Sequence, residues 1–435
     1  MKVFRHLILL IFIFCFAVLT GCIGANSADA EGAGKLQSNE ITEPNEDVEI
    51  KFWTYNDGWS TIIKGFESTH PKIKIKLEKF DFNQISSEYK KAISLGEGPD
   101  ILLLDSAYFS EYTKEGYFED LEGEPYLAGK YEDDFPRDVW ESNRAINGDL
   151  IAMTILVSPI VTYYRYDVMR DNGFPAEPIE FGDFIENPEN LLTVATKLKK
   201  NEQYIFQTPS DLMSLLGSTK GFFDADLNFI RNTEQFTDML DVSKQTYKSE
   251  LIFGRSIFEQ EKQTDDGKEL VMIFNMGSWG AGSIQEMMPG QGGKWRVTRP
   301  PLGVRAPASD TKLAINSQSK NKQWAWRFVE YIVTQQDGGE NINMVSAYIP
   351  ARKNMRVMLR EDAFFGEQLI QPMFEELALE MRHYRHTPLD AEALQIFNRG
   401  VYEAIINDID SEETMENIKN EAEERVKEYR RDLPK

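Results

Sequence analysis

The sequence predicts an α/β fold in which a mainly parallel sheet carries helices on both faces. Between residues 48 and 104, segments with alternating apolar residues, as in a strand, take turns with segments in which apolar residues recur at helical spacing. This order requires right-handed crossovers that return to one sheet. The chain also has 435 residues, 41% of them apolar, which is enough for a large core and favours two or three domains over one.

Five elements follow one another in this stretch. Val48, Ile50 and Phe52 occupy alternate positions of a strand, whereas Trp59 to Phe66 has helical spacing and stops before His70-Pro71. The pattern then repeats as a strand at 73–77, a helix at 84–95 and an apolar strand at 101–104.

The N-terminus has the pattern of a secretory signal peptide. Lys2 and Arg5 precede an apolar run from Leu7 to Val18. This run is shorter than the roughly 18–20 residues of a membrane-spanning helix. The segment Leu19-Thr20-Gly21-Cys22 that follows resembles the bacterial lipobox. It predicts cleavage before Cys22 and acylation of that cysteine, with an ordinary signal peptide (residues 1–21) and an incidental cysteine as the alternative.

Composition and charge limit the partners. Residues 22–46 are small, polar and acidic, which predicts a flexible tether before a folded part that begins near Asp47. The chain has a net charge of −23, and loss of residues 1–21 removes two positive charges, leaving about 25 excess negative charges. Nucleic acid is disfavoured as a partner because phosphates are held by clustered Lys and Arg. Membrane contact is expected only through the lipid on Cys22.

Two predicted strands end in residues suited to binding. Open α/β sheets bind ligands beyond the carboxyl ends of their strands. The first strand ends in Trp53 to Asp57 and the third in Asp105 to Tyr108, so that aromatic rings lie beside short polar groups. This composition suits stacking on an apolar ring face while its hydroxyls are hydrogen-bonded. Core packing of the aromatic residues and helix capping by Asp105 are the alternatives.

Six motifs, in order along residues 47–355, resemble those of one family, the extracellular solute-binding proteins of ATP-driven sugar importers (family 1, maltose-binding-like). The motifs are FESTHPKIKIKLE, SLGEGPDILLLDS, NGDLIAMTILVSPIVTYYRYDVMRDNGFP, MIFNMGSWG, TKLAINSQSKNKQWAWRFVEYIV and YIPARKN. The resemblance implies a periplasmic-binding-protein-like fold of two α/β lobes, each with a mainly parallel sheet, joined by three hinge crossings. It places an N-terminal lobe at 47–155 and 306–348, and a C-terminal lobe at 156–305 and 349–435.

The resemblance also implies a ligand site between the lobes. Carried over position by position, the implied contacts are Trp53, Tyr55, Asp57, Asp105, Ser106, Tyr164, Ser278, Trp279 and Tyr348. Tyr163 and Tyr164 compete for one place, because adjacent residues of a strand point to opposite faces. Two residues, Arg165 and the inserted Met276, depart from the family's usual motifs. They make single contact assignments less secure but do not affect the fold that the resemblance implies.

The residues give little support to catalysis or metal binding. His383 and His386 have no HExxH-like or CxxC partner motif. Asp224 to Gln235 has the first spacings of an EF-hand loop, yet Phe229 replaces the required glycine and Gln235 the bidentate Glu. We therefore expect no catalytic residues, no metal and no cofactor.

The resulting functional prediction is a receptor on the extracytoplasmic face of the cell membrane, anchored by the lipid on Cys22. The expected protein is a monomer that binds a small polar solute, with an oligosaccharide favoured, and passes it to an ABC permease. Two alternatives remain open. One is a surface lipoprotein that degrades glycans, and the other is a solute receptor for a sensor kinase.

Overall fold

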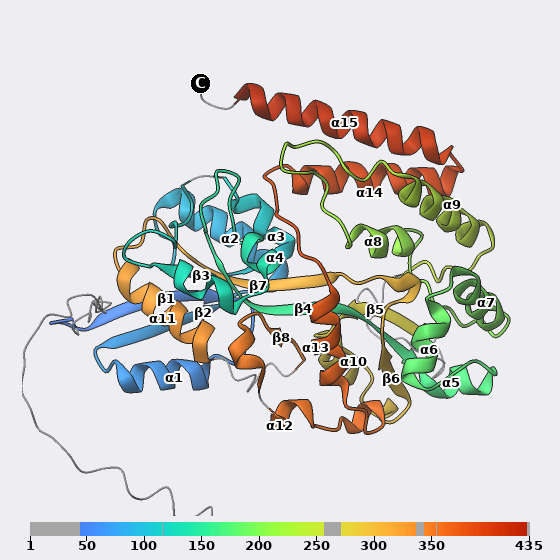
Figure 1. Ribbon diagram of the computed structural model, residues 1–435, viewed down its shortest axis with the longest axis horizontal. Helices are drawn as coiled ribbons and strands as arrows, with labels where there is room; N and C mark the ends of the chain where they lie inside the picture. The colour runs from blue at the N-terminus through green and yellow to red at the C-terminus, as the bar shows by residue number, and fades with distance from the viewer. Residues whose placement is uncertain (1–43, 115, 256–270, 336–342, 354, 433–435) are drawn as a thin grey trace, which may run out of the picture. The chain divides into compact units, whose positions relative to one another are not determined.

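The computed structural model describes residues 44–114, 116–255, 271–335, 343–353 and 355–432 (Figure 1). Its strands are β1 Val48–Thr54, β2 Ile73–Lys79, β3 Ile101–Asp105, β4 Met153–Arg165, β5 Ile273–Gly277, β6 Trp295–Thr298, β7 Pro307–Ile315 and β8 Val345–Ser346. Its helices are α1 Ser60–Thr69, α2 Phe82–Leu95, α3 Ser106–Phe109, α4 Arg137–Glu141, α5 Tyr166–Asp171, α6 Pro178–Ile185, α7 Pro188–Lys199, α8 Asp211–Gly217, α9 Glu234–Lys248, α10 Gly280–Met287, α11 Lys322–Gln335, α12 Met355–Met358, α13 Ile370–Glu380, α14 Asp390–Asn407 and α15 Ser411–Asp432. Cys22, the predicted signal peptide and most of the predicted tether lie outside the described residues.

The five elements predicted at the start of the folded part are confirmed as β1, α1, β2, α2 and β3. β1 pairs in parallel with both β2 and β3. α2 begins where the side chain of Asp81 accepts a hydrogen bond from the backbone N–H of Asn83 at 2.9 Å, and it ends at Gly96, which adopts a left-handed conformation with φ 71°. The carboxyl ends of β1 and β3 therefore lie at one edge of the sheet.

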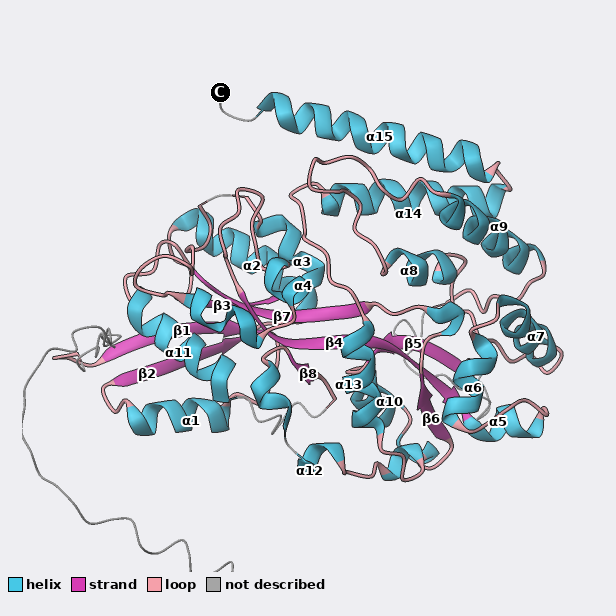
Figure 2. Cartoon of the chain, in the orientation of Figure 1, coloured by secondary structure: helices cyan, strands magenta, loops and turns pink. Residues whose placement is uncertain are grey.

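The sheet runs in the order β2-β1-β3-β7-β4-β5, with β6 and β8 also paired to β4. We call β2, β1, β3 and β7 the first sheet half, and β5 and β6 the second. β4 is buried along its whole length, and it pairs with β7 through its first part and with β5 and β6 through its last. Pro159 lies inside this strand at a shift of register, where a missing ladder hydrogen bond is tolerated. One strand thus runs through both halves (Figure 2).

The prediction of a mainly parallel sheet in each lobe needs correction. Parallel pairing holds for β1, β2 and β3, but β4 is antiparallel to both β5 and β6. Among the described residues, parallel pairing in the second half is limited to the single bridges Tyr204–Val271 and Phe206–Ile252. The strand-helix alternation that requires parallel crossovers was identified in residues 48–104, and it does not determine strand pairing in the second half. The predicted lobe limits remain a prediction.

The carboxyl-terminal helices form a cluster of their own. Met415, Ile418, Ala422 and Val426 form an apolar stripe on α15 and are buried with residues of α8, α9 and α14. Figure 2 shows α14 and α15 side by side next to α8 and α9. In the part of the chain that the structure describes, no helix has the length and apolarity needed to cross a bilayer.

Candidate functional site

Three cavities meet around Ala308 of β7. Cavity A has a volume of about 460 Å³, cavity B about 340 Å³ and cavity C about 310 Å³, and Ala308 lines all of them. Cavity A lies at the carboxyl ends of β1 and β3, where Tyr55 and Asp105 face Trp279, which follows β5. The two sheet halves therefore both contribute to its wall.

Asp105 is the buried carboxylate of cavity A. It begins α3, and its Oδ1 accepts a hydrogen bond from the Ala107 amide at 2.9 Å. Its Oδ2 accepts a second bond from the Tyr55 hydroxyl at 3.3 Å. Burial, together with the negative charge of Asp310, raises the pKa of Asp105 to about 6, against the lowering effect of the Ala107 amide. Asp105 is thus an ionisable acceptor whose charge changes just below neutral pH.

Trp279 separates cavity A from cavity B and lines both. Its side chain is 36% exposed, although it follows the buried Gly277 and Ser278. The turn beneath it is held by Tyr163, whose buried hydroxyl lies 3.0 Å from the Gly277 carbonyl oxygen and 2.9 Å from that of Ser278. Tyr163 therefore positions the indole without reaching either cavity itself.

Cavity B offers polar groups from β5 and α8. Asn275 lines it, and its side-chain oxygen accepts a hydrogen bond from Thr162 Oγ1 at 2.7 Å. This bond fixes the amide plane of Asn275. Asp211 also lines the cavity and accepts a bond from the Gln207 amide at 2.6 Å, and burial raises its pKa. Both side chains are therefore held in place before any ligand binds.

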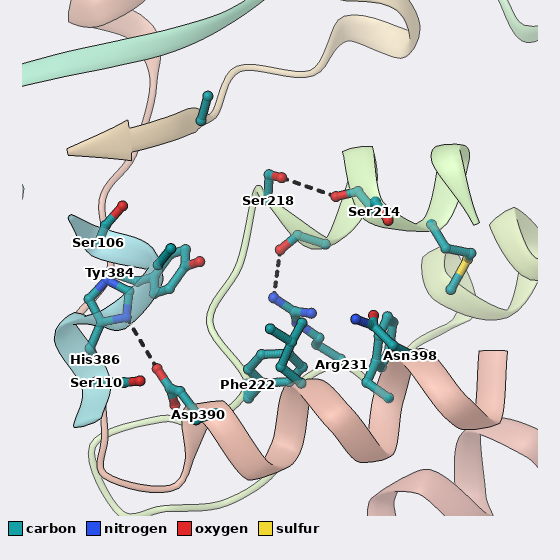
Figure 3. A pocket seen from close by; sticks show the side chains of 17 residues that line it. Ser106, Ser110, Ser214, Ser218, Phe222, Arg231, Tyr384, His386, Asp390 and Asn398 are labelled. Atoms are coloured by element: carbon teal, nitrogen blue, oxygen red, sulfur yellow. Dashed lines mark hydrogen bonds and ion pairs between the residues drawn. The ribbon is translucent and has the colours of Figure 1, made fainter. Parts of the chain in front are cut away.

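Cavity C lies between α3, α8 and α14 (Figure 3). The Arg231 guanidinium lies over the ring of Phe222, 3.6 Å from its centroid, and donates to the Gly217 carbonyl at 2.6 Å. Burial lowers the pKa of Arg231 to about 10. Across the cavity, His386 Nδ1 lies 3.4 Å from a carboxylate oxygen of Asp390.

A buried charge cluster that includes two residues of β7 lies next to this site. His383 Nε2 lies 3.0 Å from Asp310 Oδ1, and its Nδ1 lies 3.6 Å from Asp138 Oδ2. Lys312 Nζ lies 3.7 Å from Asp310 and donates to Thr154 Oγ1 at 2.9 Å. Burial lowers the pKa of His383, but the two carboxylates outweigh it and raise that pKa to about 9. The segment between α13 and α14 is thereby tied to β7 and α4.

The structure brings four predicted site residues to these cavities. Tyr55, Asp105 and Trp279 line cavity A, and Ser106 lines cavity C. Ser106 Oγ also accepts a hydrogen bond from the Asp310 amide at 3.0 Å, which holds α3 against β7. The alternative role of Asp105 as a helix cap is present together with its place in the cavity wall.

The other five predicted contacts line none of the three cavities. Trp53 packs against Phe80 and Tyr89 beneath α2, and Asp57 is 84% exposed beyond the strand end, paired with Lys79. Tyr164 is fully buried against Phe181 on the opposite face of β4 from Tyr163. Ser278 is buried and its Oγ lies 2.9 Å from Ser158 Oγ, whereas Tyr348 packs against Tyr131 and Phe135. Each of these side chains contacts a packing, hydrogen-bonding or charged partner that lies outside the three cavities.

Several lining residues were missed from the sequence. They are Asn56, Phe82, Asn275, Asp211, Arg231, Ala308, Thr311 and Met344. Asn56 and Phe82 could have been found, because they flank the end of β1 and the start of α2. Asp211 comes from the start of α8 and Arg231 from the loop before α9, and neither segment has a distinctive pattern. The position of Ala308 in the cavity walls depends on the register of β7 on β4, which the sequence does not reveal.

The lining chemistry suits a polar ligand with apolar ring faces. Tyr55, Phe82 and Trp279 supply aromatic surface, and Asp105, Asn275 and Asp211 supply hydrogen-bonding groups. Within the described ranges, no group of three or more His, Cys, Asp or Glu side chains could hold a metal ion. Asp224, the start of the EF-hand-like segment, instead accepts backbone bonds from Asp226 and Asn228.

Comparison with known proteins places this geometry among binding proteins. Residues 61–363 match the sequence profile of the family described as bacterial extracellular solute-binding protein. The chain is 20% identical over 349 residues to the multiple sugar-binding protein of Streptococcus mutans, covering 73% of this chain and 78% of the relative.

Two solved structures show the same fold. An extracellular solute-binding protein of family 1 superposes with a TM-score of 0.75 at 16% identity, over 87% of this chain and 99% of that chain. The second is the galacto-N-biose-/lacto-N-biose I-binding protein of an ABC transporter from Bifidobacterium longum, in complex with lacto-N-biose. It superposes with a TM-score of 0.72 at 17% identity, over 89% of this chain and 98% of that chain. The predicted periplasmic-binding-protein-like α/β fold is thereby confirmed.

Proposed function

The chain belongs to the family of bacterial extracellular solute-binding proteins, and from this premise we propose that it is a receptor for a sugar, in particular an oligosaccharide. A solute-binding protein of this family is a receptor rather than an enzyme. The ligand would lie in the cleft formed by cavities A, B and C. The relatives named for sugars support this ligand class.

The observation that carries the proposal is the wall of cavity A. A partly exposed indole, Trp279, stands opposite Tyr55 and the carboxylate of Asp105, with Asn56 and Thr311 nearby. The two faces of a sugar ring are partly apolar, whereas its rim carries hydroxyls. Aromatic surface beside fixed hydrogen-bonding groups meets both requirements.

Binding would close the two sheet halves on the ligand. Tyr55 and Asp105 belong to the first half and Trp279 to the second, so a ligand that touches all three binds best when the halves are close. A ligand shifts such an equilibrium only by its differential affinity for the closed state. An ABC permease that recognises the closed form would then receive the loaded receptor.

Anchoring through a lipid on Cys22 completes the proposal, and it would place the receptor on the extracytoplasmic face of the cell membrane. The support is the lipobox-like segment from Leu19 to Cys22. Expression of the full chain with radiolabelled palmitate tests it. Label that is lost in Cys22→Ser, with release of the protein from the membrane fraction, is the expected result, and equal labelling of both proteins contradicts the anchor.

A thermal-shift screen tests the ligand class. The full chain is heated with neutral and acidic oligosaccharides, amino acids, peptides and metal ions. Ligand at 100 times its dissociation constant adds about 2.7 kcal/mol of stability, a shift of a few degrees. A shift with one glycan family, without hydrolysis products, is expected. A shift only with peptides or metal ions contradicts the sugar proposal, and hydrolysis of the glycan contradicts the receptor role.

A further inference from the structure

We propose that the cleft binds a linear saccharide of at least three ring units, one in each cavity, and that Ala308 sets this length. The inference rests on the proposed sugar-binding function and adds to it a ligand size and a residue that determines it. Ala308 is small and exposed, and it is the residue that cavities A, B and C have in common.

Shared walls show that the cavities are continuous around this residue. Trp279 lines both A and B, Ala107 lines both A and C, and Ser214 and Ser218 line both B and C. Each pair of cavities is therefore separated by single side chains rather than by a layer of core. The volumes of about 310, 340 and 460 Å³ each lie near the lower end of ligand sites.

The register of β7 explains why Ala308 reaches the cleft. Pro307 is paired with Pro159 of β4 and Ser309 with Ser158, so Ala308 is an extra residue between two consecutive pairs. Such a bulge leaves its residue unpaired, bends the strand and redirects the side chain. The bulge thus presents a single methyl group where the three cavities meet, and a larger side chain there would fill the junction.

Each cavity has its own means of holding a ring. Cavity A has the aromatic faces of Tyr55 and Trp279, and cavity B has the fixed amide of Asn275. In cavity C, Figure 3 shows Ser106 and Tyr384 on one side and Ser218 and Asn398 on the other. A ligand confined to cavity A would leave the polar groups of B and C unused, so affinity should rise with chain length.

The test compares ligand lengths in two proteins. The full chain and Ala308→Phe are titrated by calorimetry with α-1,4-glucose, β-1,4-galactose and β-1,4-xylose oligomers of one to five units. In the unmodified protein, affinity should rise by about tenfold or more from one to three units with the recognised series and then level off. In Ala308→Phe this gain with chain length should disappear. Ala308→Ser is the matched control and should retain the gain.

A second variant guards against a folding defect. Phenylalanine is tolerated in strands and the site is exposed, so the melting temperature of Ala308→Phe should match that of the control. If the melting temperature of Ala308→Phe is lower than that of the control, a second variant, Ala107→Leu, is used. It narrows the passage between cavities A and C at another exposed position and should remove the gain in affinity that the third unit brings. Equal affinity for one and three units in the unmodified protein overturns the length proposal alone, as does an intact gain in whichever variant folds. Absence of binding to any saccharide overturns the proposed function itself.

Discussion

The indole of Trp279 lies directly against the backbone of Gly277, so that a Cβ atom at position 277 would overlap the indole nitrogen. The same Cβ would lie 2.6 Å from Ser158 Oγ, so the strand on the other side leaves no room for it either. Gly277 therefore determines where the wall between cavities A and B stands. Glycine is required at position 277 because only a residue without a Cβ atom lets the indole of Trp279 lie this close to the backbone.

Gly277→Ala should weaken sugar binding by about tenfold, because Trp279 must turn away from its place between the cavities. Trp279→Ala should weaken it at least as much without unfolding the protein. Calorimetric titration with the saccharide found in the thermal-shift screen measures both effects. Gly282→Ala in α10 is the matched control, since its Cβ would meet one side-chain atom at an ordinary 3.5 Å. Equal affinity of the two glycine variants would show that Gly277 does not control the position of Trp279 in the binding site.

Asp105 should make binding depend on pH in a defined direction. Its pKa is raised to about 6, chiefly by burial, so it gains a proton as the pH falls from 7 to 5. Hydrogen bonds from ligand hydroxyls to a carboxylate are stronger than those to the neutral acid. Affinity should therefore fall several-fold across this interval, and titrations at pH 5, 6 and 7 measure it.

Asp105→Asn is the control for this pH effect, because asparagine can still cap α3 but does not titrate. The variant should bind more weakly at pH 7 and show a flatter profile between pH 5 and 7. If the unmodified protein and the variant lose affinity in parallel as the pH falls, another group is responsible.

Local periodicity was sufficient to predict β1 to β3, because each of these strands depends on neighbours in the chain. The rule that ligands lie beyond strand ends was sufficient to place Tyr55 and Asp105 in the wall of cavity A. Trp53 shows its limit, since a residue two positions from Tyr55 is covered by α2. The choice between Tyr163 and Tyr164 required knowing which face of β4 meets Gly277, and the position of Ala308 required the register of β7 on β4. Both are long-range relationships that no single segment encodes.

Arg231 should be important for stability. Its Nε and Nη2 atoms donate to the carbonyl oxygens of Gly217, Lys220 and Gly221 near the end of α8, where no helical partner remains for them. Arg231→Ala would remove these bonds and leave the carbonyl oxygens of Lys220 and Gly221 without their donor, so it should lower the free energy of unfolding by about 3 kcal/mol. Urea denaturation measures the loss. Arg399→Ala, which removes an exposed pair with Glu421, is the control and should change little. If Arg231→Ala loses no more free energy of unfolding than the control does, the proposed stabilising role of Arg231 is contradicted.

His383 should make stability fall between neutral and alkaline pH. Its pKa is raised to about 9 from an ordinary value of 6.5, because Asp310 and Asp138 outweigh burial and the opposing charge of Lys312. The folded protein therefore holds a proton that the unfolded chain has released, and this stabilisation is complete below pH 6.5 and lost as the pH rises through 9. Urea denaturation at pH 6, 7.5 and 9 should show a loss of about 2–3 kcal/mol that His383→Gln lacks. Asp138→Asn should shrink the loss, since it removes one of the two carboxylates that hold the proton. If the free energy of unfolding falls with pH equally in the unmodified protein and in both variants, the pH dependence arises elsewhere in the protein.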